Sequence, residues 1–222
     1  MIGANGIGKS TLLRTITGLQ NPISGTILLD GEPLQKMSAS EIAKKISVVL
    51  TEKLPPSNLT VYELVASGRH PYTNWIGSLA PQDKKCIDDA IQITGIESLV
   101  NKKSHQLSDG QLQTVMIARA LAQDTPIIVL DEPSTHLDIV HKAKLFRLLK
   151  KLAHEQQKAI LFSTHDIELA LETSDEIIMM AGGKTIQENT VDFIRGNHIR
   201  NLFEDPDIQF DPEKVKFVFK NL

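Results

Sequence analysis

A glycine-rich loop at the start of the chain constrains the fold more than any other segment. Residues 3–10 read Gly-Ala-Asn-Gly-Ile-Gly-Lys-Ser, which fits the pattern G-x-x-x-x-G-K-[ST], and Thr11 extends it. Glycines let a backbone curl until successive N–H groups converge on one anion, and the helix that follows directs its positive end at the same point. The pattern therefore predicts a phosphate-binding loop in an α/β protein, followed by a helix from Lys9.

Each residue type in this loop has a role in binding phosphate. The side chain of Lys9 would reach the β- and γ-phosphates, and the hydroxyl of Ser10 can bind Mg²⁺. A glycine-rich turn with a chance Gly-Lys-Ser is the alternative, but apolar residues at helical spacing follow at once, which disfavours it. The predicted nucleotide-binding residues are Gly3, Asn5, Gly6, Gly8, Lys9, Ser10 and Thr11.

Strand-like and helical segments alternate along the 222 residues. Short apolar runs at 46–50, 127–130, 159–163 and 177–180 predict strands, and the helix between the second and third gives the rhythm of a parallel sheet. A capping box at Ser38 predicts a short helix that leads into the strand at 46–50. Between about 52 and 123 the strand signal is absent, and helices are predicted to begin at Thr60, Pro81 and Ser108. We therefore expect one domain with a parallel core sheet and an inserted helical lobe.

Composition and charge exclude several classes of protein. Lys and Arg number 24 against 27 Asp and Glu, which gives a net charge of −3. Proteins that bind nucleic acid cluster positive charge, so no nucleic-acid partner is expected. No apolar run approaches the ~20 residues of a membrane-spanning helix. Cys86 is the only cysteine, which excludes an intrachain disulfide and favours a reducing, cytoplasmic setting.

Two carboxylates follow the apolar strand at 127–130. Ligands of α/β proteins bind at the carboxyl ends of parallel strands, and this arrangement is the Walker B pattern. Asp131 would hold Mg²⁺, and Glu132 would orient or deprotonate the attacking water. A solvated acidic turn ahead of Pro133 is the alternative, but the position 122 residues after Lys9 favours a catalytic pair.

The sequence Leu-Ser-Asp-Gly-Gln at 107–111 is a second candidate for phosphate binding. Ser108 and Gln111 satisfy the capping-box rule, so helix nucleation alone would explain them. In the functional interpretation Ser108, the backbone of Gly110 and the positive helix end meet a phosphate. The segment by itself does not decide between these two interpretations.

Together these motifs resemble the nucleotide-binding domain of an ABC transporter, over essentially the whole sequence. Residues 107–111 are similar to the LSGGQ signature, and the run 134–138 resembles the D-loop with its Asp138. The run 161–166 is similar to the segment that carries the switch histidine, and the resemblance implies that His165 contacts the γ-phosphate. The other six histidines match no such catalytic position.

The resemblance implies an ATP hydrolase that uses ATP and Mg²⁺, with Glu132 and His165 as its catalytic residues. Two copies would pair head to tail, so that residues 3–11 of one and Ser108, Gly110 and Gln111 of the other hold each ATP. The ATPase would bind permease subunits at the cytoplasmic face of the inner membrane and act with a substrate-binding protein indirectly. Residues 64–72 most resemble the ATPases of iron-siderophore, haem and cobalamin importers.

The sequence departs from the family pattern at two places. The glutamine of the Q-loop is replaced by Glu52, or by Thr51 with a one-residue slip, which removes the amide's donor. Family members also have a strand and an adenine-stacking aromatic ahead of the phosphate loop, and here only two residues precede Gly3. We therefore expect residues 1–222 to be an ABC ATPase domain without its N-terminal strands, with lower stability and weaker ATP binding.

Two other functions fit parts of the pattern. A soluble ABC ATPase outside transport is one, although a coiled-coil insertion, a duplicated cassette or a basic surface would be expected for most of these. A catalytically impaired binding or regulatory subunit is the other, because of the short start and the missing glutamine. Turnover of ATP in the presence of the permease separates these functions.

Overall fold

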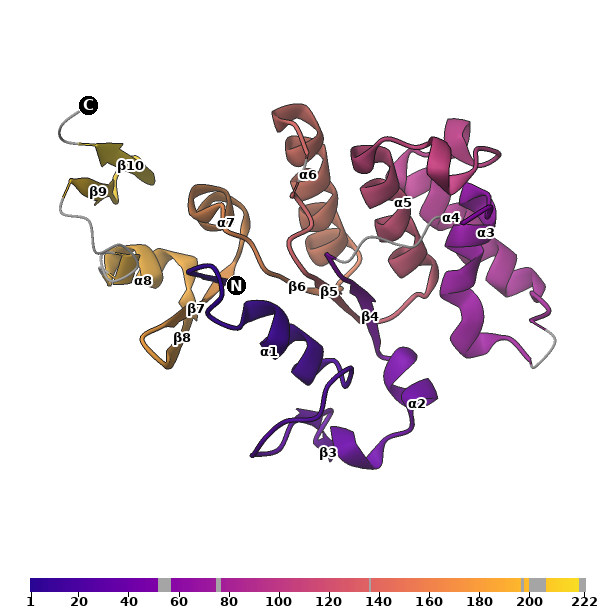
Figure 1. Cartoon of the computed structure of the whole chain (residues 1–222), viewed down its shortest axis with the longest axis horizontal. Coiled ribbons are helices and arrows are strands. Elements are labelled where there is room, and N and C mark those ends of the chain that lie inside the picture. Colours follow the sequence, from indigo (N-terminus) through magenta and orange to yellow (C-terminus); the bar gives the residue numbers. More distant parts are fainter. Residues whose placement is uncertain (52–56, 75–76, 136, 197, 200–206, 220–222) are drawn as a thin grey trace. The chain divides into compact units, whose positions relative to one another are not determined.

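Figure 1 shows the computed structural model of the chain, which describes residues 1–51, 57–74, 77–135, 137–196, 198–199 and 207–219. Contacts divide the chain into two compact units. One comprises residues 1–12 and 162–222, and the other comprises residues 13–161. Helix α1 (Lys9–Ile16) begins in the first unit and ends in the second.

The first unit is built on a three-stranded sheet in the order β1-β7-β8. Strand β1 (Ile2–Gly3) is parallel to β7 (Glu176–Ala181), with Ile2 opposite Met179, and β8 (Lys184–Asn189) is antiparallel to β7. The unit also contains α7 (Ile167–Thr173), α8 (Thr190–Arg195) and the hairpin β9 (Ile208–Asp211) and β10 (Lys216–Phe219).

An apolar core holds this unit together and fixes the strand that leads into the phosphate loop. Ile2, Ile177 and Phe193 are completely buried, and burial of each such side chain stabilises the fold by roughly 1.5 to 3 kcal/mol. The whole cluster consists of Ile2, Ala170, Leu171, Ile177, Met179, Phe193 and Ile199. The loop therefore follows directly from a residue anchored in the core.

The second unit contains the sheet β4-β5-β6, formed by Ile46–Val49, Ile127–Leu130 and Ala159–Phe162. Strands β4 and β5 are parallel, with Val49 opposite Leu130. Residues 128–130 are all buried, as expected for a parallel strand covered on both faces. The predicted parallel core sheet is confirmed. A short hairpin, β2 (Leu28–Leu29) and β3 (Glu32–Pro33), turns at Asp30-Gly31.

Helices of the second unit begin where the capping residues predict. Ser38, Thr60 and Ser108 each accept the N–H of the residue three positions later, whose side chain accepts the cap's own N–H. The α-helices are α2 (Ala39–Ala43), α3 (Val61–Ala66), α4 (Pro81–Thr94), α5 (Asp109–Ala122) and α6 (Ile139–Glu155). The 3₁₀ helices are η1 (Leu34–Lys36), η2 (Ser67–Tyr72), η3 (Glu97–Leu99) and η4 (Ser104–Gln106).

The first helix ends near Gly18, the glycine that the sequence predicts as its end, but it is shorter than the expected length of about three turns. The apolar residues at helical spacing include Leu19, yet α1 stops at Ile16 and Leu19 is 58% exposed. Gly18 adopts a left-handed conformation with φ of 77°, which turns the chain away before Leu19 can join the helix.

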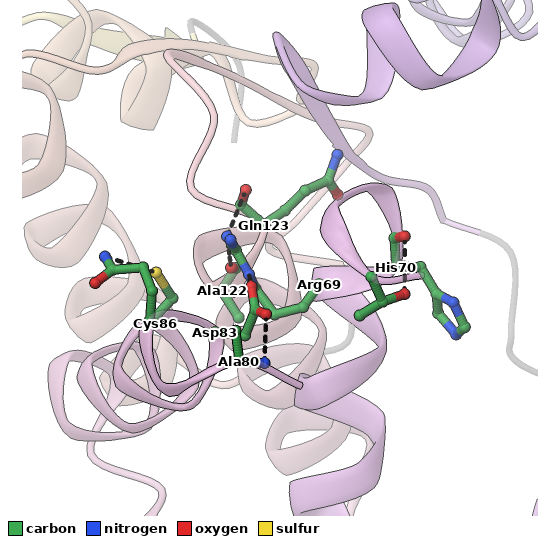
Figure 2. A network of polar contacts seen from close by, with 9 residues as sticks. Arg69, His70, Ala80, Asp83, Cys86, Ala122 and Gln123 are labelled. Carbon is green, nitrogen blue, oxygen red and sulfur yellow. Dashed lines mark hydrogen bonds and ion pairs between the residues drawn. The ribbon is translucent and has the colours of Figure 1, made fainter. Parts of the chain in front are cut away.

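Helices α3, α4 and α5 pack together between β4 and β5 along the chain, as the predicted lobe requires. Figure 2 shows the ion pair at their centre, where Nε of Arg69 lies 2.9 Å from Oδ1 of Asp83. Nη1 of Arg69 donates to the carbonyl oxygens of Ala122 and Gln123 at 2.9 and 3.2 Å, and the ring of Tyr72 lies 3.9 Å from the guanidinium. Arg69 therefore joins η2, α4 and the end of α5.

Two side chains from α5 and its C-terminus bind the segment around β4. Nε2 of Gln123 donates to the carbonyl oxygens of Ala43 and Ile46, and Nη2 of Arg119 donates to that of Val48 at 3.2 Å. Burial lowers the pKa of the Arg119 guanidinium from its ordinary value. These bonds fix the lobe to the core sheet within this unit.

Candidate functional site

Lys9 lies at the centre of the predicted phosphate loop. Its side chain is only 6% exposed, and Nζ donates to the carbonyl oxygens of Gly3 at 2.9 Å and Ala4 at 3.2 Å. Both acceptors are neutral backbone groups of the loop itself. The loop therefore curls around the ammonium group, as a phosphate-binding loop must.

The backbone of the loop requires glycine and leaves room for an anion. Gly3 has φ of 153° and Gly6 has φ of 77°. A Cβ atom on Gly3 would lie 2.6 Å from the carbonyl oxygen of Met180, whereas one on Gly6 would meet nothing within 4 Å. Gly6 therefore faces open space, and the helix that begins at Lys9 directs its positive end toward the loop.

His165 belongs to the same unit as the loop and comes three residues after the end of strand β6. Ser163 and Thr164 are buried, and the N–H of Thr164 donates to the carbonyl oxygen of Met1 at 3.0 Å. Asp166 then caps α7 by accepting the N–H of Leu169. His165 itself is exposed between these two fixed neighbours. The structure thus holds the histidine segment beside the strand that leads into the loop.

Asp131 stands at the carboxyl end of β5 in the other unit. The residue is 3% exposed, and its N–H donates to the carbonyl oxygen of Val49 at 2.8 Å. Oγ1 of Thr51 donates to the carbonyl oxygen of Asp131 at 3.0 Å, which places one Q-loop candidate beside the acidic pair. The other candidate, Glu52, lies outside the described residues.

Glu132 has an unusual backbone conformation. Its φ is 48°, in the left-handed region that costs a side chain such as Glu about 1 to 3 kcal/mol and that clusters at functional sites. Oγ1 of Thr135 donates to Oε2 of Glu132 at 3.0 Å, and the N–H of Thr135 donates to the carbonyl oxygen of Glu132. Thr135 therefore fixes the carboxylate of Glu132. The sequence analysis did not predict this role, although a residue three positions after Glu132 and beyond Pro133 is placed as in a turn.

The signature segment forms a complete helix cap at the surface. Oγ of Ser108 accepts the N–H of Gln111 at 3.3 Å, and Oε1 of Gln111 accepts the N–H of Ser108 at 3.2 Å. Gly110 is packed more closely, since a Cβ atom there would lie 3.2 Å from Cδ2 of Leu137. The structure therefore places Gly110 of the signature against Leu137 of the D-loop. Ser108 and Gln111 form the helix cap that the sequence predicts, and the N-terminal end of α5 is exposed.

The D-loop aspartate caps helix α6. Oδ1 of Asp138 accepts the N–H of His141 at 2.9 Å, and Oδ2 lies 2.8 Å from Nδ1 of the same residue. The bond from the His141 backbone, followed by the one from its side chain, holds the pKa of Asp138 below its ordinary value. His141 was assigned no chemistry, although an Asp followed by a His three residues later at a helix start indicates this pairing.

The candidate residues fall into two groups, one in each unit. The loop and His165 share the first unit, and the second contains Thr51, Asp131, Glu132, Asp138 and the signature. Across the described ranges, no three His, Cys, Asp or Glu side chains gather to hold a metal ion. The same residues include no helix that is both long and apolar enough to cross a membrane.

Comparison with protein families gives a match over residues 1–135 to the ABC transporter family. The chain therefore belongs to this family. An uncharacterized ABC transporter ATP-binding protein of Methanocaldococcus jannaschii is 44% identical over 84% of the chain. The petrobactin import ATP-binding protein FpuD of Bacillus anthracis is 40% identical over 80%, and the iron(3+)-hydroxamate import ATP-binding protein FhuC of Bacillus subtilis is 37% identical over 97%.

The chain spans 64% and 65% of the length of the first two relatives and 81% of the third. The names of the second and third relatives confirm the predicted likeness to ATP-binding proteins of iron-siderophore importers. Among solved structures, a chain described as a metal-chelate type ABC transporter matches with a TM-score of 0.80 at 25% identity, over 98% of this chain and 82% of that one. A dimeric bacterial ABC transporter cassette matches with a TM-score of 0.73 at 32% identity, over 85% of this chain and 83% of that one. The predicted P-loop NTPase fold is confirmed.

Proposed function

We propose that this chain binds and hydrolyses ATP to drive an importer of an iron-siderophore, haem or cobalamin-type substrate. The observation that carries the proposal is the phosphate loop, where carbonyl groups of Gly3 and Ala4 hold the buried Lys9 beside the open space over Gly6. Relatives named for petrobactin and iron(3+)-hydroxamate import support the direction of transport and the substrate class.

The loop binds the phosphates through backbone and side-chain donors. Its N–H groups and the positive end of α1 meet the phosphate oxygens, and Lys9 turns from the loop carbonyls to the β- and γ-phosphates. Ser10 and Asp131 are hard oxygen ligands of the kind that Mg²⁺ prefers, with phosphate oxygens and waters as the rest. Bound Mg²⁺ would neutralise phosphate charge.

Two residues act on the reacting groups. Glu132 orients the attacking water, with its carboxylate held by the hydroxyl of Thr135. His165 contacts the γ-phosphate from a segment whose neighbours are buried and hydrogen-bonded. The left-handed backbone of Glu132 supports this assignment, because such strain is retained where function requires it.

A second copy completes each site in this proposal. The exposed end of α5 presents Ser108, Gly110 and Gln111 to ATP bound by the other copy. Asp138 is exposed and follows Leu137, the residue that lies against Gly110. The dimeric cassette among the solved neighbours supports this arrangement. The two copies would bind permease subunits at the cytoplasmic face of the inner membrane, and the permease would receive its substrate from a binding protein.

Glu132→Gln in the protein assembled with its permease tests the proposal. ATP should bind as tightly as to the parent, while turnover falls at least about a hundredfold, because the group that activates water is lost. Glu213→Gln, an exposed glutamate on the β9–β10 turn, is the control and should leave turnover unchanged. Equal turnover in the Glu132→Gln variant removes the residue from this role. ATP binding without any turnover in the parent favours the regulatory subunit instead.

A further inference from the structure

A cavity of about 450 Å³ lies in the second unit. Its walls come from the last turn of α4, the segment that follows it, the first turns of α5 and the face of α6 (labelled in Figure 1). A volume of this size is in the range of small-molecule sites, about 300 to 1,000 Å³. Two residues of the proposed signature, Gly110 and Gln111, are among its lining residues.

The lining combines an apolar floor with neutral and cationic polar residues. Ile96, Ile117 and Leu145 are buried apolar side chains that face it. Glutamine, threonine and serine residues and Lys144 supply the polar part. Of the lining residues that the structure describes, none is an aspartate or a glutamate.

This composition selects the charge of an occupant. A bound cation would find no carboxylate among the described lining groups, whereas an anion would meet Lys144, which is exposed on α6. His141 also lines the cavity, and its Nδ1 lies 2.8 Å from Oδ2 of Asp138. The apolar floor requires an occupant whose remaining part is hydrophobic.

We propose that this cavity binds a small organic anion with an apolar body, such as a medium-chain carboxylate. The carboxylate contacts the ammonium group of Lys144, and the hydrocarbon lies against Ile96, Ile117 and Leu145. Gly110 and Leu137 also line the cavity, so the occupant touches residues of the signature and the D-loop at once. Binding itself does not depend on the proposed ATPase activity.

Titration of octanoate into the ATP-free protein, followed by two-dimensional NMR, tests this site. Octanoate should shift the resonances of the lining residues saturably. Lys144→Glu should weaken binding about fivefold, the scale of one partly exposed ion pair, and Lys144→Gln should weaken it less. Lys150→Glu makes the same charge change on α6 at a residue that does not line the cavity, and it should leave the affinity within about twofold.

Octanol and octylammonium complete the experiment, because they keep the hydrocarbon chain of octanoate and change its charge. Both should bind the parent more weakly than octanoate, and Lys144→Glu should raise the affinity for octylammonium. Absence of shifts at the lining residues overturns the site. Equal weakening by Lys144→Glu and Lys150→Glu overturns the local contact, and octanol binding as well as octanoate overturns the choice of an anion.

Discussion

Lys9 and Arg69 are both buried cations, with 6% and 5% of their surface exposed, yet their surroundings differ. Lys9 donates to two backbone carbonyl oxygens of its own loop, beside open space. Arg69 donates to the carboxylate of Asp83 and to two further carbonyls, and the ring of Tyr72 covers it. One cation is compensated by a full negative charge inside the chain and the other by dipoles.

The difference teaches that burial alone does not mark a binding residue. Removing a charge from water costs several kcal/mol, and a hydrogen-bonded carboxylate partner offsets much of this cost. Arg69 has that partner and holds helices together. Lys9 has only carbonyl dipoles among the acceptors described above, so an incoming phosphate would supply the missing negative charge. The partner of a buried cation, more than its burial, therefore separates structure from function.

The largest expected effect comes from taking away the partner of Arg69. Asp83→Ala leaves a buried guanidinium without its carboxylate and should lower the free energy of unfolding by about 3 to 5 kcal/mol. Denaturant titration followed by circular dichroism measures it. Asp88→Ala, at an exposed position on the same helix, should change stability by less than about 0.5 kcal/mol. A loss below about 1 kcal/mol for Asp83→Ala would remove the contrast with Lys9.

Lys9→Ala should act on the ligand instead of the fold. Loss of two charge-assisted bonds to phosphate, about 1.5 kcal/mol each, should weaken ATP binding about a hundredfold. Calorimetric titration measures this affinity, and the melting temperature should change little. Lys36→Ala removes an exposed lysine and should leave the affinity unchanged. Strong destabilisation by Lys9→Ala with unchanged ATP affinity would reverse the two assignments.

Arg69→Lys sharpens the comparison by keeping the charge while removing the planar fork. A lysine reaches one acceptor where arginine reaches the carboxylate and two carbonyls, so we expect a loss of about 1 to 2 kcal/mol in unfolding free energy. The same denaturant titration measures it. A variant as stable as the parent would show that charge alone, without geometry, holds η2 to α4 and α5.

Acid should produce the smallest effect. The N–H of Ala80, and then the bond and charge of Arg69, hold the pKa of Asp83 below its ordinary value. A carboxyl with a depressed folded pKa stabilises the fold above its unfolded pKa of about 3.9 and loses that contribution as pH falls through the folded value. Stability should therefore decline below about pH 4 more steeply in the parent than in Asp83→Asn. Parallel pH profiles would contradict this.

Local signals predicted much of the fold. The caps at Ser38, Thr60 and Ser108 were readable because each involves a residue only three positions away. The strand at 127–130 was readable because a fully buried parallel strand is continuously apolar. These features depend on neighbours in the sequence, so the sequence alone contains them.

Contacts between distant residues were not predictable in this way. Arg69 and Asp83 are separated by a loop and a helix start, and neither has a spacing that indicates a pair. The bond from Thr51 to Asp131 joins residues 80 positions apart. Thr135 and His141 lie only three residues from their partners, Glu132 and Asp138. Their contacts were overlooked because Glu132 and Asp138 were interpreted only for their roles in the motifs. The cavity depends on three helices at once, and no single segment encodes it.

The left-handed backbone of Glu132 has a consequence for directed evolution. Glycine or asparagine tolerates φ of 48° with less strain than glutamate, so replacement there would relieve the backbone by about 1 kcal/mol. A library screened only for heat resistance would therefore enrich substitutions at position 132 and discard the proposed catalytic group. Selection for ATP-driven uptake would instead retain glutamate at position 132. The residue found there would therefore show whether a population had been selected for stability or for uptake.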